Sequence, residues 1–154
     1  MAIRNIVREG DPILNKKCRV VEVFDDRLAQ LIDDMTQTMH NAEGVGLAAP
    51  QVGVIKRVVV VDVGNGVIEL VNPRIIIKAG EQVTAEGCLS CPNEYGLTKR
   101  PMYVTVAAQD RNGKEFTVKG EGLLAKAFCH EIDHLDGILY KQIAIRMLRK
   151  DEIE

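Results

Sequence analysis

The segment CHEIDH carries two histidines and a glutamate in the spacing His130-Glu131-x-x-His134. On an α-helix, residues i and i+4 lie on one face about one turn apart, so both imidazoles can bind a single metal ion. Solvated polar helices show the same spacing by chance, and the motif alone does not separate the two interpretations. The place of the glutamate on the helix is the observation that separates them.

Glu131 falls on the apolar face of a helix predicted from residue 122 to 137. At about 100° per residue, Leu124, Phe128 and Leu135 define one apolar stripe, which contains Glu131. A carboxylate that faces the core is costly unless it is paired or used in chemistry. Burial also raises the pKa of a carboxyl group towards neutrality, which suits a group that transfers protons. The motif therefore favours a catalytic metal site.

Two histidines leave a metal ion under-coordinated, since catalytic zinc sites usually have three protein ligands and one open position. No histidine follows His134, and Asp136 points away from the histidine pair on the helix. Cys129 is rotated by about 100° from its neighbour His130, so it cannot reach the same ion. The remaining cysteines are the stronger candidates for a third ligand: Cys18, Cys88 and Cys91.

Cys88 and Cys91 form a C-x-x-C pair in the segment EGCLSCP. With both histidines, this pair could bind a closed structural zinc ion of the Cys2His2 type. The roughly forty residues between the pairs and the glutamate in the apolar stripe argue against that site. A thioredoxin-like redox pair is disfavoured because Pro92 and a predicted loop follow, where a helix N-terminus would be needed.

The rest of the chain must position these side chains, and its pattern predicts one α+β domain over residues 1–154. A first helix is predicted from Asp25, its candidate N-cap, to Glu43, with Gly44 ending it. Strands are predicted in the β-branched segments KRVVVVDV, GVIELVNP, RIIIKAG, YVTVAAQD and EFTVKG, with a hairpin turn at residues 64–66. The segment GVGLAAPQVG is predicted to be a loop, and one short charged helix is predicted after Tyr140.

The order of these elements is more informative than any one of them. Strands in the middle and helices towards both ends favour an α+β fold over an alternating βαβ array. The segment GVGLAAPQ also matches a weak dinucleotide-binding pattern, which requires a strand before it and a helix after it. Here a predicted helix precedes and Pro50 follows, so nucleotide binding is rejected. His40, on the first helix, is predicted to be structural or exposed.

Composition excludes several classes of protein. The chain has 154 residues, 46% hydrophobic and 27% charged, with a net charge of -2. This composition is ordinary for a globular domain, and the net charge predicts no direct nucleic-acid binding. The sequence contains no apolar run long enough for a membrane span. The N-terminal segment lacks the pattern of a signal peptide, so a cytoplasmic location is predicted. That reducing compartment favours cysteines acting as ligands, nucleophiles or core residues.

Three segments in this order resemble the three motifs of the peptide deformylases: GVGLAAPQ (44–51), EGCLS (86–90) and HEIDH followed by LDG (130–137). The similarity extends from GDPIL near the N-terminus to the last predicted helix. On these motifs the chain is identified as resembling a bacterial-type peptide deformylase. The resemblance implies antiparallel sheets around a central helix that carries HExxH.

The resemblance also implies a metal site. In this family one catalytic divalent metal ion is held by the cysteine of EGCLS and both histidines of the helix, here Cys88, His130 and His134. One thiolate with two imidazoles suits Fe(II), Zn(II), Ni(II) or Co(II), and the family implies Fe(II) in the cell. Cys91 has no role to inherit from the family, and Pro50 stands where many relatives carry another small residue.

The implied reaction is hydrolysis of the N-formyl group from the initiator methionine of nascent polypeptides, with release of formate. Glu131 resembles the general acid/base, and Gln51 with the backbone N–H of Leu89 resembles the oxyanion stabiliser. Gly46 resembles the contact to the substrate backbone, and Arg100 a basic residue near the entrance. Residues near the motifs are predicted to line the methionine pocket: Val45, Leu97, Phe128 and Cys129.

Three alternatives remain at this point: a closed Cys2His2 zinc module, another HExxH metallohydrolase such as a protease, and a deformylase-like protein without activity. The three intact motifs favour an active deformylase. Because the sequence continues only briefly after the last motif, ribosome association through a long C-terminal helix is in doubt.

Overall fold

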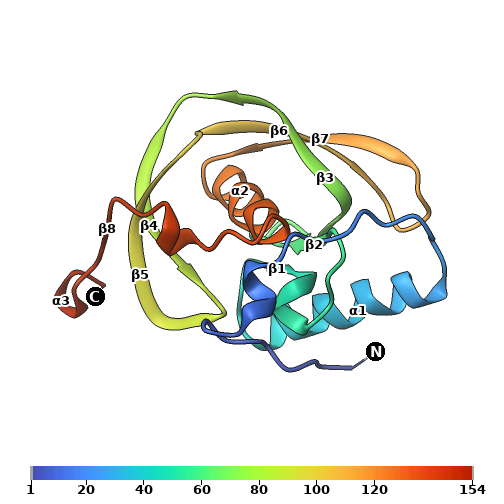
Figure 1. The fold of residues 1–154 in the computed structure, drawn as a ribbon. Coiled ribbons are helices and arrows are strands. Elements are labelled where there is room, and N and C mark those ends of the chain that lie inside the picture. The colour runs from blue at the N-terminus through green and yellow to red at the C-terminus, as the bar shows by residue number, and fades with distance from the viewer. Residues whose placement is uncertain (1, 154) are drawn as a thin grey trace.

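The computed structural model describes residues 2–153 of the chain. Its helices and strands (Figure 1) are α1 (Asp26–Asn41), β1 (Gly46–Ala48), β2 (Val58–Val61), β3 (Ile68–Ala79), β4 (Gln82–Cys88), β5 (Cys91–Arg100), β6 (Tyr103–Gln109), β7 (Glu115–Glu121), α2 (Leu123–Leu135), β8 (Arg146–Met147) and α3 (Lys150–Ile153). Short 3-10 turns are formed by Pro12–Asn15, Ala49–Val52 and Tyr140–Gln142.

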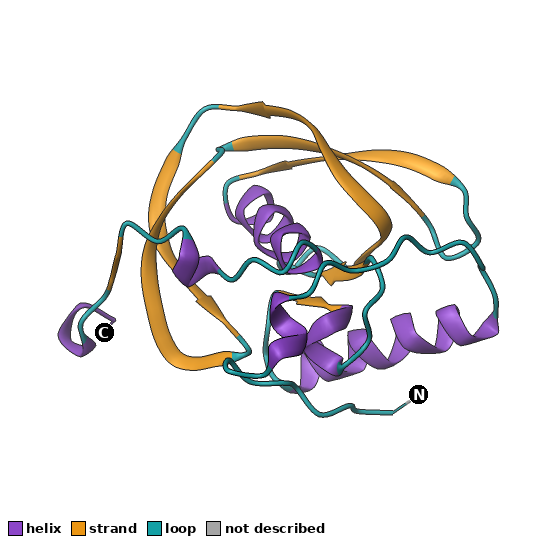
Figure 2. Cartoon of the chain, in the orientation of Figure 1, coloured by secondary structure: helices purple, strands orange, loops and turns teal. Residues whose placement is uncertain are grey.

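Two antiparallel sheets surround α2. One sheet has the strand order β1-β2-β3-β6-β7 and the other the order β4-β5-β8. The strands arch over α2, while α1 lies below β1 and β2, as Figure 2 shows. The predicted α+β fold, with antiparallel sheets around a central helix, is confirmed.

Strand β2 separates the two main apolar clusters. Val59 and Val61 pack in the cluster that contains the apolar face of α2, and Val58 and Val60 pack in the cluster that contains the apolar face of α1. All four valines are fully buried. Successive side chains of a strand point to opposite faces, so an uninterrupted run of valines is what a strand between two helices requires. This packing fixes α2 against the sheet.

Strands β3 to β6 form one long bent hairpin, and the turn at its tip, between β4 and β5, lies beside α2. β3 pairs with β6, and β4 pairs with β5, in nearly one continuous register from Val71↔Gln109 to Cys88↔Cys91. The ribbon changes sheet where Gly80 and Glu81 face Pro101 and Met102 between the paired strands. Cys88 therefore lies at the tip of the hairpin, next to the helix that carries the two histidines.

Both long helices form as predicted. The Asp25 carboxylate accepts a hydrogen bond of 3.1 Å from Leu28 N and caps α1, and Leu28, Leu31, Ile32, Met35 and Met39 are its buried apolar residues. His40 lies near the end of α1 and pairs with Asp62 at 2.8 Å on the surface, as expected. Within residues 2–153, no helix is long and apolar enough to cross a membrane.

Two segments differ from the prediction. The segment predicted to be a loop contains β1, whose residues Gly46–Ala48 pair with β2 and are buried. A strand of this length shows no periodicity in sequence, so only its pairing reveals it. The hairpin of β4 and β5 was not predicted either, because Pro92, Asn93 and Gly96 are poor strand formers. Backbone pairing across the ribbon overrides that local preference. The predicted segment RIIIKAG is the continuation of β3.

Asn72 ties the segment before α1 to the sheet. Its side chain accepts a hydrogen bond from Val21 N (2.8 Å) and donates to Val21 O (3.0 Å) and to Gln109 Oε1 (2.8 Å). Its backbone φ of 51° is in the left-handed region, which asparagine tolerates better than most residues. One side chain thus joins three parts of the chain.

Replacing Asn72 by alanine should lower the free energy of unfolding by about 2 kcal/mol, because it leaves partly buried backbone groups without partners. Urea denaturation of the variant and the parent protein measures the difference. Asn65→Ala, in the exposed turn between β2 and β3, is the matched control and should change stability by less than about 0.5 kcal/mol. Equal losses in the two variants would contradict the role of Asn72.

Candidate active site

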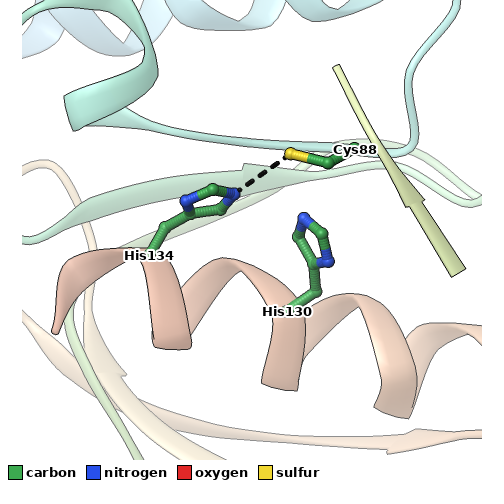
Figure 3. A group of neighbouring side chains, drawn as sticks. All are labelled: Cys88, His130 and His134. Carbon is green, nitrogen blue, oxygen red and sulfur yellow. Dashed lines mark hydrogen bonds between the residues drawn. The ribbon is translucent and has the colours of Figure 1, made fainter. Parts of the chain in front are cut away.

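Three candidate metal ligands from two distant segments meet in the structure. Cys88 ends β4, and His130 and His134 lie one turn apart on α2. One ligand atom from each lies within 4.8 Å of the others, and Cys88 Sγ is 3.3 Å from His134 Nε2. Figure 3 shows the thiol and both imidazoles directed towards a common point.

The donor set fits one divalent metal ion. Tetrahedral zinc with one sulfur and two nitrogen ligands places neighbouring ligand atoms roughly 3.3–3.6 Å apart, close to the 3.3 Å between Cys88 and His134. One thiolate with two imidazoles is a donor set that Fe(II), Co(II), Ni(II) and Zn(II) accept. The pairs that include His130 lie within 4.8 Å.

Glu86 sets the orientation of His130. Its Oε2 lies 2.6 Å from His130 Nδ1, and both side chains are buried. A carboxylate at this distance accepts the Nδ1–H of the imidazole, which leaves the Nε2 lone pair free to face a metal ion. The ring is thereby held in one tautomer and one orientation.

Arg100 and Thr98 hold Glu86 in turn. The Arg100 guanidinium donates to both oxygens of Glu86, at 3.0 and 2.7 Å, and to Asp133 at 2.7 Å. Thr98 Oγ1 donates to the same carboxylate at 2.7 Å. Burial alone would raise the pKa of Glu86, but the hydrogen bonds from His130 and Arg100 hold it well below its usual range. Glu86 therefore stays charged and accepts the Nδ1–H of His130.

Glu131 is the contrasting carboxyl group. It is 4% exposed, its Oε1 has no hydrogen-bond partner within residues 2–153, and its Oε2 lies 3.9 Å from His130 Nε2. Burial raises the pKa of Glu131 to about 7. Near neutral pH such a group can both accept and donate a proton. The unpartnered Oε1 is the atom of Glu131 that is free to exchange a proton.

Two glycines of the segment 44–51 make room for the site. A Cβ at Gly46 would lie 2.5 Å from Glu131 Oε2, and one at Gly44 would lie 2.6 Å from Leu89 Cδ1. A side chain at either position would displace a group of the site. Glycine at these two positions is thus explained by the side chain that packs against each of them.

Gln51 connects the same segment to the hairpin tip. Its Oε1 accepts a hydrogen bond from Ala48 N at 3.0 Å, and its Nε2 donates to Ser90 Oγ at 3.1 Å and to Cys88 Sγ at 3.5 Å. The side chain is 1% exposed. The amide N–H group is therefore held beside the thiol at the wall of the cavity.

A cavity of about 650 Å³ opens onto these residues. Its lining includes Val45, Gly46, Gln51, Cys88, Leu89, His130 and Glu131, so the structure brings these predicted site residues together. His134 lies behind them, fully buried at the far side of the ligand group. The cavity is large enough to admit the end of a peptide.

Four residues predicted to contact the substrate lie elsewhere. Phe128 and Cys129 belong to the apolar cluster between α2 and the sheet, because they lie about 200° and about 100° round the helix from His130. Leu97 pairs with Ala85 and Arg146 within its sheet. Within residues 2–153, neither these nor Arg100 line the cavity, and Arg100 is 5% exposed. The entrance role expected for Arg100 is therefore wrong; it orients Glu86.

Sequence reasoning missed residues that the structure brings to the site. Glu86 belongs to the segment EGCLS, but its value as a partner of His130 depends on pairing across the hairpin. Lys126 lies four residues before His130 and thus on the same helix face, a spacing that could have indicated it. Tyr95 covers Gly87, where an added Cβ would lie 2.7 Å from its ring. Both Lys126 and Tyr95 line the cavity.

This arrangement, a buried HExxH helix with a thiol from a hairpin tip, is that of a metallohydrolase whose third candidate ligand is a cysteine. The family described as polypeptide deformylase matches residues 3–150. The chain belongs to this family. Its members depend on a metal ion, and the group of Cys88, His130 and His134 is the candidate site for it.

Individual relatives agree with the family. A peptide deformylase of Caldicellulosiruptor bescii is 59% identical over 100% of this chain and 93% of its own length. The crystal structure of a peptide deformylase from Legionella pneumophila is 48% identical, with a TM-score of 0.90 over 92% of this chain and 86% of that one. That from Thermotoga maritima is 39% identical, with a TM-score of 0.91 over 94% and 99%.

These findings exclude two of the three alternatives left by the sequence. The closed Cys2His2 module is not what the structure contains, because Cys91 lies outside the group formed by Cys88 and the two histidines. Membership of the deformylase family excludes an unrelated HExxH protease. The three motifs of this family occur in the predicted order and meet at one cavity.

Glu86→Gln should weaken divalent metal binding about 10- to 100-fold, because it weakens the hydrogen bond that orients His130. Competition with a chromophoric chelator measures the affinity, and circular dichroism checks that the variant folds. Glu81→Gln is the control, since Glu81 is exposed and pairs with Lys99 at 3.2 Å. A Glu86 variant that binds metal as tightly as this control would contradict the orienting role.

Proposed function

We propose that residues 1–154 form one catalytic domain that removes the N-formyl group from the N-terminal formylmethionine of nascent polypeptides and releases formate. Family membership supports the activity. The observation that carries the assignment to this site is the meeting of Cys88, His130 and His134 beside the buried carboxyl group of Glu131. Because the proposed substrate is a nascent polypeptide, we propose that the reaction takes place in the cytoplasm. No element within residues 2–153 is assigned to a ribosome contact.

Cys88, His130 and His134 hold one divalent metal ion in this proposal. Fe(II) is the ion proposed for the cell, and Zn(II), Ni(II) and Co(II) are compatible with the same ligands. When bound, the ion supplies Lewis acidity and lowers the pKa of a water molecule. The protein contributes the fixed orientation of His130, through Glu86, and the amide group of Gln51 next to Cys88.

Glu131 moves the proton. Its unpartnered Oε1 takes the proton of the attacking water and later delivers it to the nitrogen of the departing methionine amine. Hydrolysis of the formamide thus yields formate and a free amino group. Gln51 Nε2 and the Leu89 N–H stabilise the negative charge on the formyl oxygen, a contribution worth about 10²–10³ in rate for one donor.

The wall of the cavity beside His130 defines where the first side chain of the substrate binds. Leu123, Lys126 and Ala127 precede the ligand on α2, and Val45 lies on the facing segment; all four line the cavity. Lys126 Nζ donates to Ala85 O at 2.8 Å and to Thr84 Oγ1 at 3.1 Å, so its aliphatic stem spans from α2 to β4 at the recess that these four residues line. We propose that this stem limits the depth of the methionine subsite.

The deciding test of the activity is an anaerobic assay of formate release from formyl-Met-Ala-Ser by protein loaded with Fe(II) or Ni(II). Folded, metal-loaded protein that released no formate would contradict the proposal.

Glu131→Gln should retain the metal ion and lose about 10²–10⁴ in kcat, because proton transfer loses its carrier. Metal content by atomic emission and kcat from the formate assay give the two readouts. Glu121→Gln, an exposed position on β7, serves as the control with unchanged kcat. Near-normal turnover by the Glu131 variant would refute the proton-transfer role.

Lys126→Ala should open the recess and raise the kcat/KM for formyl-Phe-Ala-Ser relative to formyl-Met-Ala-Ser about tenfold, a change typical of altered pocket depth. Lys126→Met keeps the length of the stem without its charge, so it should keep the parent preference. Lys99→Ala, at an exposed lysine, is the control for the loss of a surface charge. An unchanged ratio in Lys126→Ala would show that the stem does not limit the subsite.

A further inference from the structure

Cys88 and Cys91 face each other across the hairpin tip. They are direct partners of β4 and β5, separated by the turn of Leu89 and Ser90. Direct partners in an antiparallel pair have Cα atoms about 4.5–5.5 Å apart. A disulfide requires about 4.4–6.8 Å. The backbone therefore already holds these two residues at a separation that a disulfide can span.

Their side chains also lie on the same face of the hairpin, because direct partners of an antiparallel pair project to one side. Both are free thiols. Both residues line the cavity. Cys88 is partly exposed there, so a small solute that enters the cavity reaches its thiol, whereas Cys91 is 2% exposed and packs with Leu14, Leu139 and Tyr140. Cys91 is therefore placed to react with Cys88 and not with the solute. Cys18 and Cys129 lie in the apolar cluster beneath the sheet.

Cys91 has a second group of neighbours that does not compete for its thiol. Glu9 and Glu94 gather close to it in a group with metal-ligand geometry. Lys141 Nζ donates to both carboxylates, at 2.7 and 2.8 Å. One ammonium group already pairs with both carboxylates, so a metal ion there would have to displace Lys141. The chemistry open to Cys91 is consequently that of its contact with Cys88.

We propose that Cys88 and Cys91 are a redox modification site, in which hydrogen peroxide or an organic hydroperoxide converts the two thiols into a reversible intramolecular disulfide. Cys88 is the more exposed of the two; its sulfur attacks one oxygen of the peroxide and becomes a sulfenic acid, while the O–O bond breaks and the other oxygen leaves with the thiol proton as water or an alcohol. Cys91 then displaces water from that sulfur and forms the S–S bond. Two thiols and one hydrogen peroxide thus give one disulfide and two waters, and a dithiol reverses the reaction.

The disulfide and the metal ion compete for one sulfur atom. A thiolate can ligate a metal ion, whereas a sulfur in a disulfide has lost the charge that makes it a ligand. Oxidation would therefore release the ion and stop hydrolysis, while Cys91 protects Cys88 from irreversible oxidation to a sulfinic acid. This consequence rests on the proposed role of Cys88 as a ligand, but formation of the disulfide does not.

The test treats metal-free protein with hydrogen peroxide, blocks remaining thiols with N-ethylmaleimide under denaturing conditions, and digests with trypsin. Both cysteines fall in one tryptic fragment, residues 79–99, between Lys78 and Lys99. The proposal expects this fragment to be two hydrogens lighter, without maleimide, and to become doubly labelled after dithiothreitol. Cys18 and Cys129 should be labelled throughout and serve as internal controls.

Three results would overturn the proposal: maleimide on both cysteines after oxidation, disulfide-linked dimers on a non-reducing gel, or a sulfinic acid at Cys88 beside a free Cys91. Cys91→Ser should make oxidation of Cys88 irreversible by dithiothreitol. Cys18→Ser, the matched control, should behave as the parent protein. A Cys91 variant that recovers fully would contradict the protective role.

A second arm uses zinc-loaded protein and a chromophoric zinc indicator. Zinc should appear in solution in step with the disulfide. If the disulfide forms while zinc stays bound, Cys88 is not a ligand and the competition is wrong, although the disulfide itself stands. Failure of the redox site and failure of the metal site are thereby distinguished without an activity measurement.

Discussion

The buried carboxylate of Glu86 is the interaction on which the site depends. It joins β4, β5 and α2, because it accepts hydrogen bonds from Thr98, Arg100 and His130. A carboxylate this deeply buried is tolerated only when its hydrogen-bonding capacity is filled. The same contacts that satisfy Glu86 therefore fix the distance between the hairpin tip and the helix. The position of Cys88 relative to the histidines follows from this network.

Glu131 is buried without the hydrogen bonds that Glu86 has, and the pKa values of the two carboxyl groups shift in opposite directions. Glu86 is surrounded by donors and keeps a pKa far below its usual range, whereas burial raises the pKa of Glu131 to about 7. An incompletely hydrogen-bonded buried carboxyl group costs folding free energy, on the order of 1–3 kcal/mol. The apolar packing on both sides of β2 offsets such a cost. Divergent environments for two nearby carboxyl groups are what separate a structural role from a proton-transfer role.

Sequence patterns reveal the parts of this fold in which local preference and tertiary structure agree. The helix α1, with its Asp25 cap, and the buried Glu131 on α2 follow from periodicity alone. Strand β1 and the β4–β5 hairpin do not, since one is too short for a pattern and the other contains poor strand formers. Arg100 shows the same limit at a single residue, because its partner Glu86 is a neighbour only once the ribbon has folded. Lys126 could have been found from its spacing to His130, but its tether to β4 could not.

The hairpin tip also explains why a cysteine, and not another residue of the helix, completes the ligand group. Leu135, the last residue of α2, lies in the apolar cluster, and Asp136, directly after the helix, pairs with Arg57 at 3.0 Å. A third ligand must therefore come from another element, and the turn of Leu89 and Ser90 presents a short side chain at the required place. The tight register that brings Cys88 to the histidines brings Cys91 to Cys88 as well. Close approach at a hairpin tip and the possibility of a disulfide are thus consequences of one constraint, so the spacing of C-x-x-C here carries chemical meaning beyond metal binding.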